Sequence, residues 1–162
     1  MEFRSIKGTY DVLPNDADRW QRVETHVRGF ITRAGYSEIR TPAFEKTELF
    51  TLSVGEDSDV VSKEMYSWTD QGGTDLTLKP EYTASVMRSY IQHNLGAQSP
   101  LTKLYYLDNL FRRERPQKGR YRQFRQYGIE AIGSPHPEQD AEIIAIAYEL
   151  LKIGRASCRE RV

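Results

Sequence analysis

The sequence has almost no cysteine and no long apolar run, and these two absences exclude several classes of protein. Cys158 is the one cysteine in 162 residues, so the chain can form neither an internal disulfide nor a cysteine-based zinc cluster. No apolar stretch approaches membrane-spanning length, and the first residues are too polar for a signal peptide. We therefore expect a cytoplasmic protein without a membrane partner.

Net charge is also lacking, because 23 acidic residues balance 23 Lys and Arg residues. The charge of the whole chain therefore gives no indication of nucleic-acid binding. The basic residues are nevertheless concentrated in one short stretch, where seven of them occur: Arg112, Arg113, Arg115, Lys118, Arg120, Arg122 and Arg125. Cations so close together repel each other unless anions share the site, so we expect a partner with several phosphates.

The basic stretch falls in a predicted antiparallel hairpin. Residues 104–112 and 122–132 have the composition of strands and flank a polar turn. Alternation along the second strand would place four residues on one face: Phe124, Gln126, Gly128 and Glu130. An aromatic ring, an amide, a gap and a carboxylate suit the floor of a small-ligand pocket better than an apolar core. A solvated surface hairpin is the alternative, but the apolar residues of 104–111 favour a buried strand.

A helix followed by a strand is predicted near the start of the chain. Asn15 and Asp16 are expected to cap the helix, and Gly35 is expected to follow its end. Residues 36–42 should form a short strand that stops at Pro42. The apolar stripe of the helix is expected to pack in the core or against another subunit.

The rest of the chain is expected to alternate between short elements and two helices. Residues 44–78 should contain a helical turn at 44–50, an acidic loop at 55–63 and a hairpin formed by 65–68 and 74–78. Pro80 is expected to open the first helix. The second should cover residues 140–153, with an apolar face made of Ala141, Ile144, Ala145, Tyr148 and Leu151.

Residues 111–124, FRRERPQKGRYRQF, resemble motif 2 of class II aminoacyl-tRNA synthetases in the form found in histidyl-tRNA synthetases. The first helix, its strand and Pro42 resemble motif 1, which forms the dimer interface in that family. The segments KGTYDVLP, EIRTPAFEKTELF, VVSKEMYSW and LTLKPEYTA extend the resemblance over nearly all of residues 6–154. It implies an α+β fold in which an antiparallel sheet is flanked by helices, the class II synthetase catalytic fold in truncated form.

Residues 1–154 would then be the N-terminal portion of that catalytic domain, with motifs 1 and 2. The tail at 155–162, RASCRERV, continues no pattern, and we expect it to derive from cloning or a vector. The family's motif 3, its histidine-specific segment and its anticodon-binding domain are not found in the sequence. We therefore expect the fragment alone not to aminoacylate and to bind histidine weakly at best. A homodimer through the motif 1 region is expected.

The resemblance implies the two-step reaction of a histidine–tRNA ligase. The carboxylate of histidine attacks the α-phosphate of ATP to give histidyl-adenylate and pyrophosphate, and the histidyl group then passes to tRNA(His). The first step needs no protein nucleophile, because it depends on holding two anions together and neutralising charge as it builds. Mg²⁺ would share the charge of the polyphosphate.

The site residues implied by the resemblance form three groups. The ATP-binding group is Arg112, Glu114, Arg120 and Phe124. The histidine-binding group is Glu81, Thr83, Arg112, Gln126 and Glu130. The residues expected near the tRNA acceptor end are Arg115, Gln117 and Lys118. Arg112 is also the expected catalytic residue, because a planar, permanently charged guanidinium can bridge a carboxylate and a phosphate. No metal ligands are expected among the side chains.

Several readings stay open at this point. Thr83 has an alternative role as the cap of the helix that follows, and Glu81 has an alternative role in complementing the dipole of that helix. Lys79 stands where the family usually has arginine, and Tyr82 stands where small residues are common. The whole chain has an alternative as a non-catalytic, histidine-sensing paralogue that regulates an ATP phosphoribosyltransferase. A general RNA-binding hairpin would need more exposed aromatic residues than Tyr121 at the tip.

Overall fold

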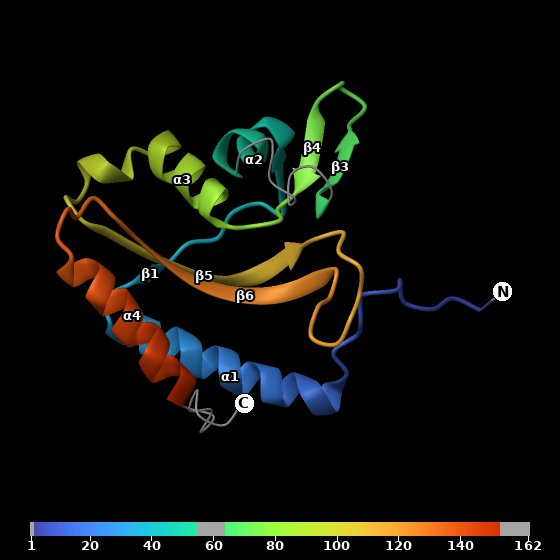
Figure 1. Cartoon of the computed structure of the whole chain (residues 1–162), viewed down its shortest axis with the longest axis horizontal. Coiled ribbons are helices and arrows are strands. Elements are labelled where there is room, and N and C mark those ends of the chain that lie inside the picture. Colours follow the sequence, from blue (N-terminus) through green and yellow to red (C-terminus); the bar gives the residue numbers. More distant parts are fainter. Residues whose placement is uncertain (1, 55–63, 153–162) are drawn as a thin grey trace.

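A long two-stranded hairpin forms the centre of the computed structural model, which describes residues 2–54 and 64–152 (Figure 1). Strand β5 (Thr102–Phe111) pairs in antiparallel fashion with β6 (Gln123–Ile132), and β1 (Ser37–Glu38) pairs in parallel with β5. A second sheet contains β2 (Phe44–Lys46), β4 (Asp75–Leu78) and β3 (Tyr66–Thr69) in antiparallel order. The α+β prediction is therefore confirmed, with the β1–β5 pair as a parallel exception.

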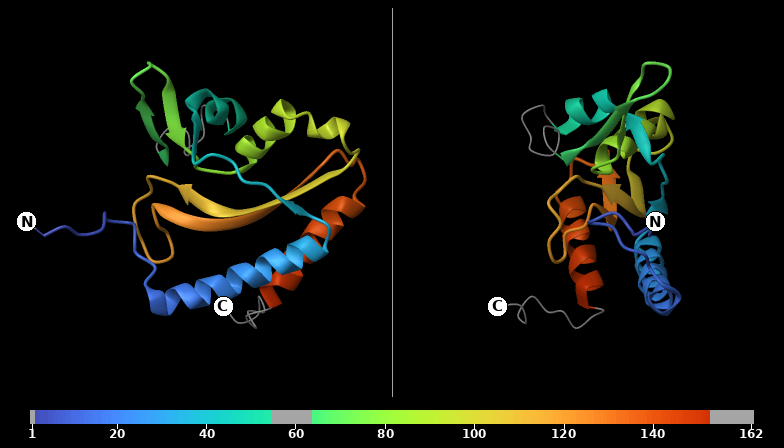
Figure 2. Two further views of the ribbon diagram at one scale, coloured as in Figure 1. Left: turned by 180° about the vertical axis from the view of Figure 1, so that it is seen from behind. Right: turned by 90° about the vertical axis from the view of Figure 1, so that its right-hand side faces the viewer.

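Helices cover both faces of the hairpin. Helices α1 (Pro14–Arg33) and α4 (Glu138–Leu151) lie on one face, as Figures 1 and 2 show from several sides. Helices α2 (Thr47–Val54) and α3 (Thr83–Gln92) lie on the other side, together with the small second sheet. A short 3-10 turn, η2 (Leu95–Ala97), connects α3 to β5. The hairpin is thus enclosed between two layers.

Alternation along β5 divides the interior into two apolar clusters. Tyr105 packs with Val27 and Ile31 of α1 on the face that α4 also covers. On the opposite face, Tyr106 and Leu110 pack beneath α3. The register pairs Tyr106 with Gly128 and Leu110 with Phe124, so the even-numbered residues of β6 share the α3 face. The alternation predicted for Phe124, Gln126, Gly128 and Glu130 is confirmed.

The starts of α1 and α3 differ from the sequence predictions. Helix α1 begins at Pro14, with Leu13 at the N-cap position, and Asn15 and Asp16 lie inside the helix. Proline suits the first helical position because the N–H that it lacks would have no intrahelical partner there. Helix α3 begins at Thr83 and not at Pro80. The predicted caps Asn15 and Asp16, and the predicted start of the later helix at Pro80, were therefore wrong.

The apolar face predicted for the last helix was also wrong. Helix α4 buries Ile146 and Leu150, whereas Ile144, Tyr148 and Leu151 are exposed. The helix carries two apolar stripes, each with the spacing of one turn, and only contact with α1 and the hairpin decides which one is buried.

The N-terminal arm braces the loop between β5 and β6. The Arg122 N–H donates to the Gly8 carbonyl oxygen at 2.7 Å, and the Tyr10 and Tyr121 rings lie 4.7 Å apart. Gly8 has a φ of +92°, and a Cβ there would lie 2.8 Å from side-chain atoms of Arg122 and Pro116. Glycine is therefore required at this crossing.

Two sequence predictions lie outside the described residues, namely the loop at 55–63 and the tail at 155–162. Within residues 2–54 and 64–152, no helix is both long enough and apolar enough to cross a membrane.

Candidate active site

A cluster of polar side chains forms where the start of α3 meets the α3 face of β6. The Thr83 hydroxyl donates to the Glu130 carboxylate at 2.8 Å. Glu81 accepts a hydrogen bond from the Ala84 N–H in the first turn of α3 at 2.9 Å, which fits its alternative role in complementing the helix dipole. Thr83 is the first residue of the helix and forms no cap. Thr83 thus contacts Glu130 directly, and Glu81 lies close enough for its charge to act on Glu130.

Burial and the charge of Glu81 act on both Glu130 and Tyr106. Burial raises the pKa of Glu130, and the negative charge of Glu81 raises it further, while the Thr83 hydroxyl opposes the shift. Burial also raises the pKa of Tyr106 to about 12, with contributions from Glu130 and Glu81. A cation or an N–H donor placed beside Glu130 would therefore favour its charged form.

Arg112 and Phe124 lie together at the loop end of the hairpin. Strand β5 ends at Phe111, so Arg112 belongs to the loop, where its Nε donates to the Pro80 carbonyl oxygen at 2.9 Å. Its guanidinium carbon lies 5.5 Å from the centre of the Phe124 ring. This contact brings the predicted catalytic arginine to the face that also carries Gln126 and Glu130.

Glu114 joins this arginine to the far side of the loop. Its two carboxylate oxygens lie 4.0 Å from Arg112 Nη1 and 3.3 Å from Arg120 Nη1. The side chain of Arg120 is largely exposed, whereas that of Glu114 is mostly covered. All four residues predicted for ATP therefore occupy one region, with the Arg120 guanidinium at its solvent side.

The residues predicted to meet tRNA lie at the tip of the loop, next to Arg120 of the predicted ATP group. Arg115, Gln117 and Lys118 are exposed at the tip of the loop. The tip is closed by reciprocal backbone hydrogen bonds between Gln117 and Arg120, across a turn in which Gly119 has a φ of +81°. Their side chains are free to meet a large partner without disturbing the polar cluster.

Sequence reasoning missed a buried support beneath the site. Lys79 is 1% exposed, and its Nζ lies 2.8 Å from Asp108 Oδ2 and 4.2 Å from the centre of the Tyr82 ring. Although burial opposes it, hydrogen bonds from Lys79 and the Asn109 N–H lower the pKa of Asp108. Tyr82 in turn stacks on Tyr106. The signal for this support was the unusual pair of Lys79 and Tyr82 in the sequence.

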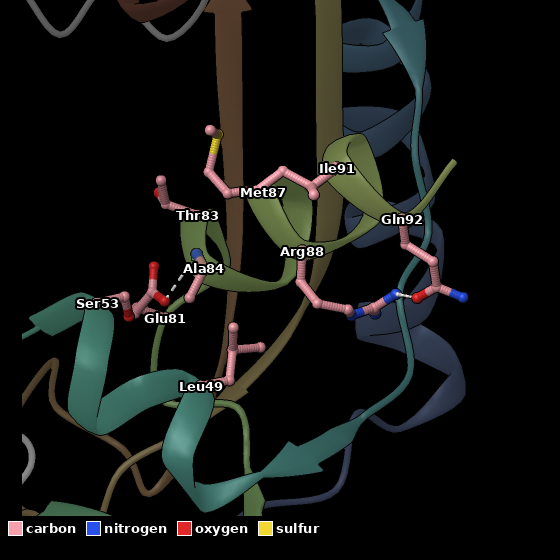
Figure 3. Close-up of a pocket in the computed structure, with 9 residues that line it drawn as sticks. All are labelled: Leu49, Ser53, Glu81, Thr83, Ala84, Met87, Arg88, Ile91 and Gln92. Atoms are coloured by element: carbon pink, nitrogen blue, oxygen red, sulfur yellow. Dashed lines mark hydrogen bonds between the residues drawn. The ribbon is translucent and has the colours of Figure 1, made fainter. Parts of the chain in front are cut away.

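A mainly apolar cavity of about 770 Å³ adjoins the polar cluster (Figure 3). It lies between α2 and α3, and its lining includes Leu49, Met87 and Ile91. Glu81 and Thr83 also line it, whereas Arg112, Phe124, Gln126 and Glu130 do not. The cavity therefore borders the cluster without containing it.

No group of three or more His, Cys, Asp or Glu side chains in the described part of the chain could hold a metal ion.

Comparison with known proteins identifies the family. A family model described as histidyl-tRNA synthetase matches residues 8–159. This chain belongs to the histidyl-tRNA synthetase family. It is 53% identical over 153 residues to the histidine–tRNA ligase of Chloroherpeton thalassium, a match covering 94% of this chain and 36% of that protein. The Geobacillus kaustophilus histidine–tRNA ligase is 51% identical over 159 residues, covering 96% of this chain and 37% of that protein.

Solved structures of this family have the same fold. Apo S. aureus histidyl-tRNA synthetase superposes with a TM-score of 0.78 at 38% identity, covering 93% of this chain and 34% of that one. A Bacillus halodurans protein described as an ATP phosphoribosyltransferase regulatory subunit/histidyl-tRNA synthetase superposes with a TM-score of 0.80 at 28% identity. The match covers 97% of this chain and 39% of that one. The chain thus spans about a third of the length of the curated relatives it matches. The resemblance inferred from motif 2 is confirmed.

Proposed function

We propose that this chain forms the part of a histidine–tRNA ligase that holds histidine and ATP against each other. The observation that carries the proposal is the row formed by Arg112, Phe124, Gln126 and Glu130, which continues to Glu81 and Thr83 at the start of α3. One end of the row is cationic and aromatic, as a nucleotide requires, and the other end is anionic, as an amino acid's ammonium and ring N–H require.

Histidine would be recognised by all three of its polar groups. Its ammonium would donate to Glu81, Thr83 and Gln126, and its imidazole N–H would donate to Glu130. Its carboxylate would lie against Arg112. Because burial raises the pKa of Glu130, an amino acid without a ring N–H would leave an unfavourable carboxylate uncompensated, and the site would reject it.

ATP would occupy the loop end of the row. Phe124 would stack on the adenine ring, Glu114 would accept from the adenine edge, and Arg120 would leave Glu114 to contact the outer phosphates. Arg112 would neutralise the α-phosphate as the histidine carboxylate attacks it in line. Mg²⁺ would arrive bound to the phosphates as part of the substrate.

The test is histidine-dependent ATP–pyrophosphate exchange in a hybrid that joins residues 1–152 of this chain to the remaining two-thirds of the Chloroherpeton thalassium ligase. We expect exchange that requires histidine. The Glu130→Gln variant should show a higher KM for histidine with an unchanged KM for ATP. Absence of exchange in a folded hybrid, or an equal rise in both constants, would contradict the proposal.

A histidine-sensing regulatory subunit is the second candidate, supported by the 28% identical Bacillus halodurans structure. A sensor needs the histidine end of the row but has no use for Glu114, Arg120 and Phe124 together. The same hybrid separates the two functions, because a sensor would bind histidine without catalysing exchange.

Further partners follow from the same proposal. Arg115, Gln117 and Lys118 would contact the acceptor end of tRNA(His), since they are exposed at the tip. The motif 1 region, from α1 to Pro42, would form a homodimer interface, and Val23 of α1 offers an exposed apolar side chain for it. The reaction belongs to protein synthesis, so the expected location is the cytoplasm. Sedimentation measurements on this chain test the dimer.

A further inference from the structure

The side-chain amide of Gln126 has one hydrogen-bond partner inside the polar cluster. Its Nε2 lies 3.5 Å from the Tyr106 hydroxyl oxygen, on the face of the hairpin that α3 covers. An amide ends in an oxygen that only accepts and a nitrogen that only donates, so its orientation decides what it can bind. A partner that fixes this orientation would set the chemistry of the site.

The charges around Tyr106 favour one direction for this hydrogen bond. Both Glu81 and Glu130 lie close enough for their charges to act on the Tyr106 hydroxyl. The hydroxyl proton is attracted toward these carboxylates, which leaves the hydroxyl lone pairs for an N–H donor. The Nε2 of Gln126 is therefore the end that faces Tyr106, and the Oε1 is left for a ligand.

The ring of Tyr106 has little freedom to move. It stacks on Tyr82 with a centroid distance of 4.0 Å and an angle of 13° between the planes. The Tyr82 hydroxyl accepts from the Thr41 N–H at 3.0 Å, so the stacking partner is itself fixed. Across the hairpin, a Cβ on Gly128 would lie 2.2 Å from the Tyr106 hydroxyl oxygen, so glycine alone leaves space for this ring. The hydroxyl is thus a fixed reference point.

We propose that Tyr106 is a positioning residue that takes the Gln126 NH₂ group and thereby turns the amide oxygen toward the ammonium group of histidine. This inference rests on the proposed function, because it assigns a support to the same ammonium site. Without the hydroxyl, the amide is free to turn its NH₂ group toward the ammonium, and two donors then face each other. The effect falls on the ammonium alone, since the imidazole and the carboxylate meet other residues.

The test measures ligand binding to the 162-residue chain by NMR titration with millimolar ligand. Histamine carries the ammonium and the imidazole, whereas 3-(imidazol-4-yl)propionate carries the imidazole and the carboxylate without the ammonium. In Tyr106→Phe, histamine should bind about tenfold more weakly, the usual cost of losing a hydrogen bond to a charged group. Imidazolepropionate should bind as it does to the unaltered chain.

The control is Tyr105→Phe, which removes a neighbouring hydroxyl from the opposite face of the same strand. It should change neither affinity. Equal weakening of both ligands in Tyr106→Phe, or no weakening of histamine, would overturn the positioning role while leaving the proposed function in place. If neither ligand binds the unaltered chain, the same titration is made on the hybrid ligase, and if the hybrid also binds neither ligand, the histidine site itself is wrong and the inference fails with it.

Discussion

The guanidinium of Arg112 lies over the ring of Phe124, 5.5 Å from its centre, although the two residues come from opposite sides of the hairpin loop. Phe124 shares its face of β6 with Gln126 and Glu130. An aromatic ring, an amide and a carboxylate are therefore arranged along one strand, and a cation from the loop lies over the ring. The backbone hydrogen bond from the Arg112 N–H to the Arg122 carbonyl oxygen, at 2.9 Å, holds the loop in register with this row.

Lys79→Ala should destabilise the chain by about 2 kcal/mol, because it leaves the partly buried Asp108 carboxylate without its partner. The matched control is Lys103→Ala, which breaks the more exposed pair with Glu142 and should cost less than about 1 kcal/mol. Urea unfolding of both variants checks the difference. Equal losses would show that burial of Lys79 has no energetic importance.

The contribution of the Lys79–Asp108 pair should also depend on pH. The pKa of Asp108 is lowered in the folded chain, so its stabilisation is present above the ordinary value of 3.8 and is lost as the pH falls through the folded pKa. The difference between the unaltered chain and Lys79→Ala should therefore shrink in strong acid.

Glu130→Gln should raise the thermal unfolding temperature at neutral pH. The pKa of Glu130 is raised by burial and by the charge of Glu81. Ionisation of Glu130 therefore lowers the stability of the folded chain as the pH rises above the ordinary value of 4.5. Removing the charge should gain less than about 1 kcal/mol, because the side chain remains in contact with water. Near pH 4 the gain should disappear. Calorimetry between pH 4 and neutral pH measures the change in unfolding temperature. A lower unfolding temperature of Glu130→Gln at neutral pH would refute the prediction.

Gly128→Ala should destabilise the chain by about 1–3 kcal/mol, because the added Cβ would overlap the Tyr106 hydroxyl and ring carbons. The three atoms nearest to the added Cβ all belong to Tyr106, so the same change in a Tyr106→Leu background should cost much less. A double-mutant cycle from chemical denaturation measures this coupling. Additive losses would mean that the two residues do not meet.

Gly8→Ala should destabilise the chain more than Gly119→Ala. Both glycines have positive φ, which costs a non-glycine residue about 1–2 kcal/mol. Open space surrounds the position of a Cβ at Gly119, whereas a Cβ at Gly8 would also press on Arg122 and Pro116. Thermal unfolding of the two variants separates backbone strain from contact between the arm and the loop, and equal shifts would argue against that contact.

Which residues of β6 share a face could be predicted from the sequence, because side chains alternate along a strand with a fixed period of two residues. Phe124, Gln126, Gly128 and Glu130 therefore had to share a face once the strand was recognised. The buried face of α4 could not be predicted in this way. Its stripes through Ile146 and Ile144 are similarly apolar, and the choice depends on how the helix docks.

The contacts that form the support beneath the site could not be predicted either, although Lys79 and Tyr82 were noticeable in the sequence. Tyr82 and Tyr106 belong to different elements, and their stacking depends on the docking of α3 over the hairpin. The buried Lys79 is stabilised by Asp108, which follows it at no regular spacing. Local patterns predict faces of single elements, whereas contacts between elements need the fold.

The most direct test of the site is ATP–pyrophosphate exchange by the hybrid ligase carrying Arg112→Ala, compared with Arg113→Ala. Arg113 is adjacent and exposed, so its variant controls for the loss of one positive charge from the loop. If Arg112 neutralises the reacting phosphate beside Phe124, its removal should lower the exchange rate about 100-fold or more, while Arg113→Ala stays close to the unaltered rate. Equal rates for the two variants would contradict the account.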